Sequence, residues 1–209
     1  MTIGIVDYGM GNIGSIQNML RYIGVSSFVS SNPIELKKAE RLIVPGVGRF
    51  DAAMRNLRER DLIESLNNMV KQDKIPTLGI CLGMQLFCEW SEEGNCAGLG
   101  YVDAQVCRFV SNEKRPIKIP HMGWSSLEPK RDHSTLSDIG ALARFYFVHS
   151  YYVQCSNAED VLAYATHGQQ FVAAFQRENV IGVQFHPEKS HRFGMQLLRN
   201  FAAGVEEPA

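Results

Sequence analysis

The sequence predicts an α/β fold: an open, mostly parallel sheet with helices on both faces and extra antiparallel strands in its second half. Two observations lead to this prediction. In the first half of the 209 residues, short apolar runs alternate with stretches whose apolar residues recur every three to four positions. Such alternation is typical of parallel strands joined by right-handed crossovers. In the second half, strand-like runs follow one another, and a hairpin turn joins two of them.

The first half contains four expected strands separated by helical segments. The strand-like runs cover 2–6, 26–29, 42–44 and 76–80. The first helical segment begins at Ile13 and ends at Gly24, and the second covers 33–39. An amphipathic stretch follows over 51–72, and the last helix of this half follows the fourth strand from about 82 to 90.

The second half has a different character. Strand-like runs cover 100–110, 145–154, 161–166, 171–176 and 181–185. The sequence RENV at 177–180 is typical of a hairpin turn, and a last helix is expected over 192–203. Residues 111–140 look loop-rich. We expect one domain over 1–204 and a short tail at 205–209.

Composition and charge exclude several classes of protein. The net charge of −1 gives no electrostatic basis for binding nucleic acid or an anionic membrane. No apolar run approaches the ~18 residues of a membrane span, and the start of the chain lacks the features of a signal peptide. The five cysteines form no C-x-x-C pair, which is typical of a reducing compartment and disfavours a zinc site or a disulfide framework. We expect a cytoplasmic protein.

The most informative stretch is GICLG at 79–83, where an expected strand meets an expected helix. A nucleophile between two glycines at such a turn is the pattern of a nucleophile elbow, here with the thiol of Cys81. A thiol at a helix N-terminus also lies near the positive end of the helix dipole, which favours the thiolate. A lone cysteine is more often a buried core residue, but the paired glycines favour the catalytic interpretation.

A second motif, HPE at 186–188, directly follows the expected strand 181–185. In extended backbone, residues two apart point to the same side, so His186 and Glu188 can act as a base and the carboxylate that orients it. A surface turn at the end of a strand is the alternative for this motif taken alone. Together with the cysteine turn, it predicts nucleophilic acyl chemistry.

A third motif, PGVG at 45–48, also follows an expected strand. Its glycines leave backbone N–H groups free to face a developing oxyanion, together with the N–H of Leu82 behind the nucleophile.

The stretch VDYGMGNIG at 6–14 has the glycine spacing of a dinucleotide-binding loop. Such a loop needs an acidic residue about 20 positions further on, at the end of the second strand. That strand ends in Ser30, Ser31 and Asn32, and Glu35 lies in the next helix. A dinucleotide-dependent oxidoreductase is therefore a distant alternative, and we expect a tight turn at the same sheet edge as Cys81.

The three motifs PGVG (45–48), GICLGMQ (79–85) and GVQFHPEKS (182–190) resemble, in order and spacing, those of class I (triad) glutamine amidotransferases. The resemblance covers about residues 2–203. Two further motifs, IPHMGW at 119–124 and YFVHSYY at 146–152, resemble the branch of this family formed by glutaminase subunits of imidazole glycerol phosphate synthase. The resemblance implies a flavodoxin-like open sheet and neither metal nor organic cofactor.

The resemblance also implies roles for individual residues. Cys81 attacks the side-chain amide of glutamine, His186 transfers protons, and Glu188 orients His186. The N–H groups that meet the oxyanion come from Gly46, Val47, Gly48 and Leu82. The residues implied to hold glutamine are Gly48, Gln85, Glu93, His149, Ser150 and Tyr151.

The partner implied by the resemblance is a (β/α)₈-barrel cyclase subunit in a heterodimer. It uses the ammonia to make imidazole glycerol phosphate and aminoimidazole carboxamide ribotide in histidine biosynthesis. The residues implied at the interface are Asn12, His121, Met122, Trp124 and Lys189, although Trp124 could instead pack under the 111–140 loop.

Ser125 and Gly14 depart from the family pattern, and so does SHRFG at 190–194. These departures leave open a paralogue that supplies ammonia to a sugar-modifying synthase of surface polysaccharide biosynthesis.

Overall fold

The computed structural model of the chain describes residues 1–111, 116–140 and 142–204. The expected tail at 205–209 lies outside these residues, as does part of the expected loop-rich region. Among the described residues, no helix combines the length and apolar character that crossing a membrane requires.

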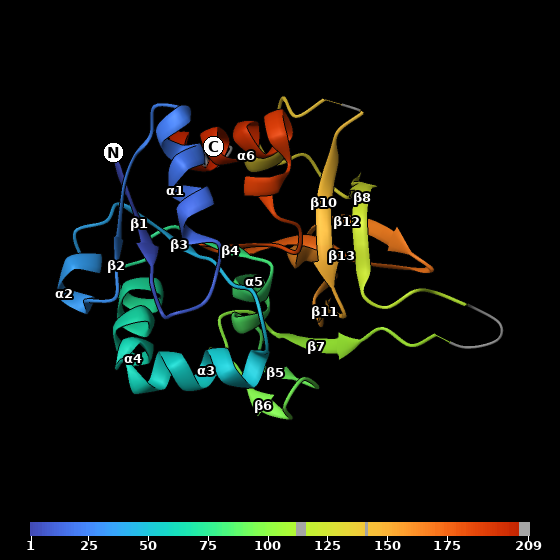
Figure 1. Cartoon of the computed structure of the whole chain (residues 1–209), viewed down its shortest axis with the longest axis horizontal. Helices are drawn as coiled ribbons and strands as arrows, with labels where there is room; N and C mark the ends of the chain where they lie inside the picture. Colours follow the sequence, from blue (N-terminus) through green and yellow to red (C-terminus); the bar gives the residue numbers. More distant parts are fainter. Residues whose placement is uncertain (112–115, 141, 205–209) are drawn as a thin grey trace.

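Five parallel strands form one half of a large sheet (Figure 1). They are β1 (Thr2–Val6), β2 (Ser26–Ser30), β3 (Arg41–Val44), β4 (Thr77–Ile80) and β14 (Val180–Val183). Their order is β2-β1-β3-β4-β14, and each pair of neighbours is parallel. Since all five strands run the same way, their carboxyl ends meet at one edge, where open α/β sheets bind ligands.

Helices cover both faces of these strands. On one face lie α1 (Ile13–Tyr22) and α6 (His191–Ala203), and on the other α2 (Pro33–Leu36), α3 (Phe50–Glu59), α4 (Leu62–Asn67) and α5 (Leu82–Leu86). Side chains alternate between two cores, because successive residues of a strand point to opposite faces. On β3, Leu42 and Val44 join the core under α3 and α4, whereas Ile43 joins the core under α1 and α6.

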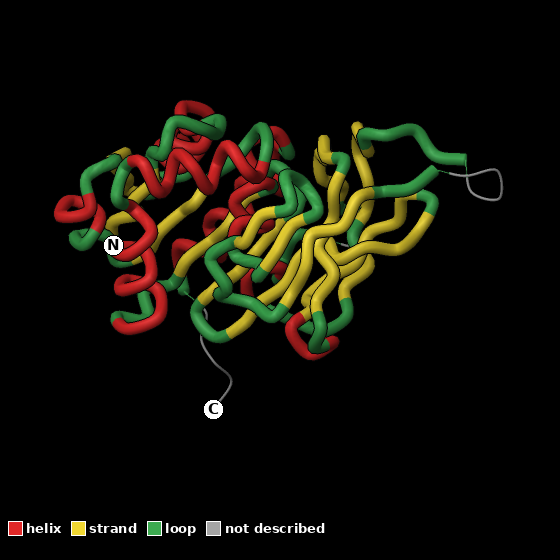
Figure 2. Tube along the Cα trace, turned by 90° about the horizontal axis from the view of Figure 1, so that it is seen from below, coloured by secondary structure: helices red, strands yellow, loops and turns green. Residues whose placement is uncertain are grey.

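Residues from 90 onward extend the sheet with further strands (Figure 2). These are β7 (Ala104–Arg108), β11 (Tyr151–Cys155), β12 (Val161–His167) and β13 (Gln169–Arg177), with the short β5 (Trp90–Ser91), β6 (Cys96–Ala97) and β9 (Glu128–Pro129). Their pairings are antiparallel except that of β5 with β7, which is parallel. A separate two-stranded ribbon pairs β8 (His121–Ser126) with β10 (Arg144–His149). The predicted fold class is confirmed.

Several boundaries differ from those expected. The helix expected over 82–90 ends at Leu86, because the carbonyls of Leu86 and Phe87 accept hydrogen bonds from the backbone N–H groups at 99, 101 and 102. The stretch 51–72 breaks at Asp61, whose φ of 54° lies in the left-handed region, and ends in a π-helical turn over 68–72. The helix expected over 33–39 ends at Leu36. The loop-rich region contains β8, which the sequence pattern did not predict.

Two glycines provide a matched test of this packing. A Cβ on Gly83 would lie 1.8 Å from the carbonyl oxygen of Val44, whereas a Cβ on Gly14 would meet nothing within 4 Å. We expect Gly83→Ala to lower the free energy of unfolding by about 3 kcal/mol or more, because backbone must move. Gly14→Ala should raise it by roughly 0.5 kcal/mol through helix propensity. Denaturant unfolding of both variants measures this, and equal midpoints would contradict the close approach.

Candidate active site

Cys81 lies in the turn between β4 and α5, at the carboxyl edge of the parallel sheet. Its backbone has φ 54° and ψ −107°, a conformation that a non-glycine residue rarely adopts. The turn is tied to the neighbouring strand, because the N–H of Cys81 donates to the carbonyl of Val183 at 2.8 Å. A Cβ on Gly79 would lie 2.5 Å from the Phe87 ring. Both flanking glycines are therefore required by close packing around this turn.

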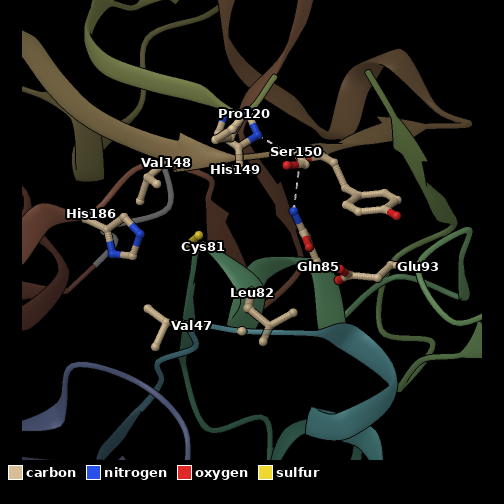
Figure 3. A pocket seen from close by; sticks show the side chains of 12 residues that line it. Val47, Cys81, Leu82, Gln85, Glu93, Pro120, Val148, His149, Ser150 and His186 are labelled. Atoms are coloured by element: carbon tan, nitrogen blue, oxygen red, sulfur yellow. Dashed lines mark hydrogen bonds between the residues drawn. The ribbon is translucent and has the colours of Figure 1, made fainter. Parts of the chain in front are cut away.

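His186 and Glu188 follow β14 at the same edge. Nδ1 of His186 lies 2.8 Å from Oε1 of Glu188, and each side chain is only 1% exposed. The N–H of His186 donates to the Tyr146 carbonyl at 2.9 Å, which holds this segment against β10. Nε2 of His186 makes no hydrogen bond to any described residue, and the ring faces Cys81 (Figure 3). The Nδ1 contact directs the free nitrogen toward the thiol.

The protonation of His186 is set by opposing effects. Burial by itself lowers the pKa of His186, but the neighbouring Cys81 sulfur and the Glu188 carboxylate outweigh burial and raise the pKa to about 10. The imidazole is therefore protonated at neutral pH and can donate a proton from Nε2.

A cavity of about 320 Å³ opens over these residues. It is lined by Val47, Gly48, Cys81, Leu82, Gln85, Glu93, Pro120, Val148, His149, Ser150, Tyr151 and His186. Most of the residues expected to bind glutamine or to carry its hydrolysis thus surround one cavity, and Glu188 lies behind His186. Gly46 does not line it.

Gln85 and Glu93 lie on one side of the cavity, opposite His186 (Figure 3). Nε2 of Gln85 donates to the carbonyl of Tyr151 at 3.1 Å and to Oε1 of Gln184 at 3.0 Å. Oε2 of Glu93 accepts from the N–H of Phe50 at 2.9 Å. Both N–H groups of the Gln85 amide are thereby used, so Oε1 of Gln85 and Oε1 of Glu93 remain as acceptors.

The PGVG loop lies beside the nucleophile turn. The hydroxyl of Tyr8 donates to the Pro45 carbonyl at 2.5 Å. A Cβ on Gly46 would lie 2.7 Å from both Leu82 Cβ and the Tyr8 hydroxyl, so this glycine allows close contact rather than lining the cavity. Gly48 has φ 115°, and Val47 is 40% exposed at the cavity mouth.

The glycines of the VDYGMGNIG stretch are explained by the same contacts. Gly9 and Gly11 have φ values of 83° and 119°, and a Cβ on Gly11 would lie 2.9 Å from Pro45. Gly14 is exposed and does not require a glycine. The stretch is therefore a tight turn packed on the PGVG loop.

Sequence reasoning missed Gln184. Its side chain is fully buried, and its Nε2 donates to Sγ of Cys81 at 3.6 Å. A glutamine inside the apolar run that leads to HPE is a usable signal, because buried polar side chains need partners.

Two histidines form a hydrogen-bonded pair at the cavity, which His149 lines and His121 does not. Nδ1 of His121 lies 3.1 Å from Nε2 of His149, and Nδ1 of His149 lies 2.7 Å from the Tyr151 carbonyl. Burial lowers the pKa of His121 to about 4 and that of His149 to about 3. Both rings are therefore neutral at physiological pH. In the part of the chain that the structure describes, no group of three or more His, Cys, Asp or Glu residues is placed to hold a metal ion.

The residues expected at an interface do not all lie on the surface. Met122 and Trp124 are 63% and 42% exposed, and Lys189 is exposed. Asn12 is half-buried. His121 is only 4% exposed, contrary to the expectation, because alternate residues of β8 point to opposite faces.

The exposed side of β8 continues into an aromatic cluster. The Trp124 ring stacks on His191 with centroids 5.5 Å apart, and it meets Tyr146 edge-on at 5.9 Å. Nζ of Lys189 lies 5.6 Å from the centroid of the Tyr146 ring. We call this cluster, with Met122, the β8 face.

Comparisons with known proteins identify relatives over nearly the whole chain. Residues 4–205 match the family described as "Glutamine amidotransferase class-I". Two curated relatives, from Methanococcus maripaludis and Pseudomonas aeruginosa, are called "Imidazole glycerol phosphate synthase subunit HisH 2". Each is 47% identical over 199 residues, 95% of this chain and 98% of the relative. "Imidazole glycerol phosphate synthase subunit HisH" of Leptospira interrogans is 41% identical over 202 residues, 96% of this chain and 99% of the relative.

Solved structures share the fold at low identity. A crystal structure of a glutamine amidotransferase aligns with a TM-score of 0.71 at 19% identity, covering 97% of this chain and 99% of that chain. A chain of PurLQS from Thermotoga maritima aligns with a TM-score of 0.71 at 14% identity, covering 97% of each chain. At these identities the likeness shows the fold alone.

The raised pKa of His186 can be tested through Glu188. We expect Glu188→Gln to lower the pKa of His186 below about 10, because one of the two groups that outweigh burial is removed while the Cys81 sulfur remains. NMR titration of the imidazole measures this.

The raised pKa of His186 also affects stability. A histidine whose pKa is higher in the folded state than in the unfolded state stabilises the folded state. This stabilisation is complete at pH values below the unfolded-state pKa, and it is lost as the pH rises through the folded-state pKa. The wild type should therefore exceed Glu188→Gln in unfolding free energy most at about pH 6, and the difference should shrink through about pH 10. A pH-independent difference would contradict the assignment.

Proposed function

Because this chain belongs to the class I glutamine amidotransferase family, we propose that Cys81, His186 and Glu188 are a catalytic triad that hydrolyses glutamine to glutamate and ammonia. One observation gives this proposal its strongest support. The buried 2.8 Å contact between His186 and Glu188 directs a free Nε2 toward a cysteine held in a strained turn. A nucleophile, a base and a group that orients the base are the parts that covalent acyl transfer needs.

In this mechanism the Cys81 thiolate attacks the side-chain amide carbon of glutamine, with His186 holding the proton. The oxyanion of the tetrahedral intermediate accepts hydrogen bonds from backbone N–H groups of Leu82 and of the 46–48 loop. The imidazolium then donates its Nε2 proton to the departing nitrogen, and ammonia leaves. His186 next takes a proton from water, which attacks the thioester and releases glutamate.

The partners still available around the cavity define a pose for glutamine. Oε1 of Gln85 and Oε1 of Glu93 can only accept, so they suit the α-ammonium group of the substrate. Backbone groups of Gly48 and of the 149–151 segment suit the α-carboxylate. The side-chain amide then reaches Cys81, which lies between Gln85 and His186 (Figure 3).

We further propose that the chain is the glutaminase subunit of an imidazole glycerol phosphate synthase. The relatives named for that subunit match over 95% or more of this chain at 41–47% identity. The ammonia would pass to a (β/α)₈-barrel cyclase subunit in a heterodimer, which makes imidazole glycerol phosphate and aminoimidazole carboxamide ribotide. Neither metal nor organic cofactor enters this chemistry, and the free cysteines suit a cytoplasmic enzyme.

The β8 face is the surface that we propose for docking this partner. Trp124 and Met122 expose apolar area there, and Lys189 adds a charge at its rim. Partly exposed aromatic anchors of this kind carry much of the binding energy of protein interfaces. Asn12, in the turn packed on the PGVG loop, is proposed as a further contact.

A second acceptor is favoured by one observation. The names of the two relatives at 47% identity carry the copy number 2. A second copy can serve another synthase with the same glutaminase chemistry, such as one that adds nitrogen to a sugar intermediate of surface polysaccharide. Ser125 and Gly14, which depart from the expected pattern, are both compatible with a changed partner.

Cys81→Ala tests both the proposed hydrolysis of glutamine and the proposed transfer of ammonia to a cyclase subunit. In the complex with its cyclase subunit, the variant should lose glutamine-dependent formation of imidazole glycerol phosphate by at least about 10³-fold, because no thioester can form. Formation supported by added ammonium salt should remain at the wild-type rate.

The outcomes separate the alternatives. Loss of both activities in the variant would contradict the division of labour between the two proteins of the complex. If wild-type protein hydrolyses glutamine but the histidine-pathway acceptor receives no nitrogen, the sugar-acceptor alternative is favoured.

Trp124→Ala tests the docking surface. We expect the affinity for the cyclase subunit to fall at least tenfold, since truncating a buried aromatic anchor typically costs about 2 kcal/mol or more. Titration calorimetry measures the affinity. The matched control is Tyr22→Ala at the end of α1, an aromatic residue that is 76% exposed and is not part of the β8 face. Equal losses for both variants would count against the β8 face.

A further inference from the structure

Gln184 is a fully buried polar residue that the triad does not use. It follows β14 and lies two residues before His186. Its Nε2 donates to Sγ of Cys81 at 3.6 Å, and its Oε1 accepts from Nε2 of Gln85 at 3.0 Å. The amide is therefore a bridge between the nucleophile and Gln85, which lies one helical turn further along the chain.

The direction of this bridge is set by a backbone carbonyl. Gln85 donates from Nε2 to the carbonyl of Tyr151, which can only accept. If the Gln85 amide were turned over, its own oxygen would face that carbonyl and repel it. Gln85 must then donate to Oε1 of Gln184, which leaves Nε2 of Gln184 to face Cys81. The sulfur consequently meets an N–H donor rather than an oxygen.

A second chain of hydrogen bonds converges on the same carbonyl. His149 lies 2.7 Å from it through Nδ1, so Nδ1 carries the proton and Nε2 accepts. Nε2 of His149 then accepts from Nδ1 of His121 at 3.1 Å, and Nε2 of His121 accepts from the Ser125 hydroxyl at 3.0 Å. Burial keeps the pKa of both rings low, so no additional proton competes for these positions.

We propose that Gln184 is a positioning residue for Cys81, whose amide N–H is held toward Sγ by the carbonyl of Tyr151 acting through Gln85, and that this N–H favours the thiolate. A donor aimed at sulfur stabilises the charged form more than the neutral one. The donor also restricts Sγ to one position between Gln184 and His186. This inference rests on the proposed role of Cys81 as the nucleophile.

Other charged or titratable groups also face the thiol or its cavity, and the test must hold them constant. They are His186 with Glu188 after β14, Tyr8 before α1, His149 on β10, Tyr151 on β11 and Glu93 after β5. None of them is changed by a substitution at Gln184. A difference between Gln184 variants therefore reports the amide itself.

The experiment measures the alkylation rate of Cys81 by iodoacetamide against pH in the full chain, with the modified peptide quantified by mass spectrometry. Gln184→Met keeps the shape and removes the donor, and Gln184→Glu places a carboxylate against the sulfur. We expect the pH midpoint to rise by about one unit in Gln184→Met and further in Gln184→Glu. The control is Gln105→Met on β7, which is exposed, and its midpoint should match the wild type.

The order of the midpoints distinguishes positioning from mere packing. A packing role alone would change the alkylation rate at every pH without moving the midpoint, and that result would overturn the proposal. If Gln184→Met does not fold, Gln85→Glu replaces it, because a carboxylate cannot donate to Gln184 and should shift the midpoint in the same direction. Glutamine hydrolysis is assayed separately, so a wild type without glutaminase activity would refute the proposed function and leave the alkylation result intact.

Discussion

The close approach of α5 to the ends of β3 and β4 is the constraint on which the site depends. The carbonyl of Val44 occupies the space in which a Cβ on Gly83 would lie, and Phe87 occupies the corresponding space at Gly79. With the helix so near, the chain can pass from strand to helix only through a sharp turn, and Cys81 takes a positive φ at its apex. The strain of that conformation is offset by packing on both sides. The result is a thiol at the sheet edge beside the PGVG loop.

The pKa values of the three buried histidines at the site differ because their hydrogen-bond partners differ. His186, His149 and His121 are all buried, and burial alone disfavours the imidazolium in each. Only His186 faces a carboxylate and a thiol, and its pKa rises, whereas the other two face neutral acceptors and their pKa values fall. Proton transfer is thereby confined to one ring of the site. Of the neutral pair, His149 donates to the Tyr151 carbonyl, and His121 donates to His149.

The β8–β10 ribbon connects the interior of the site to the exposed surface. Its alternation directs His121 and Ser125 inward to the chain of hydrogen bonds, and it directs Met122 and Trp124 outward to the β8 face. A single strand therefore contributes to both the support of the cavity and the proposed docking surface. A partner bound to that face would contact a ribbon whose inward side chains belong to the chain of hydrogen bonds that reaches the Tyr151 carbonyl.

Features that depend on neighbouring residues could be predicted from the sequence alone. Strand and helix alternation, the glycines around Cys81, and the two-residue spacing of His186 and Glu188 are local patterns, and local backbone geometry interprets them. The strand β8 and the early end of the helix at Leu86 were not visible, because pairing with distant segments decides both. The inward orientation of His121 has the same cause. Only the tertiary structure could reveal the Gln184 bridge, whose contacts join residues 99 and 103 positions apart, because side-chain hydrogen bonds at such separations leave no periodic signal in the chain.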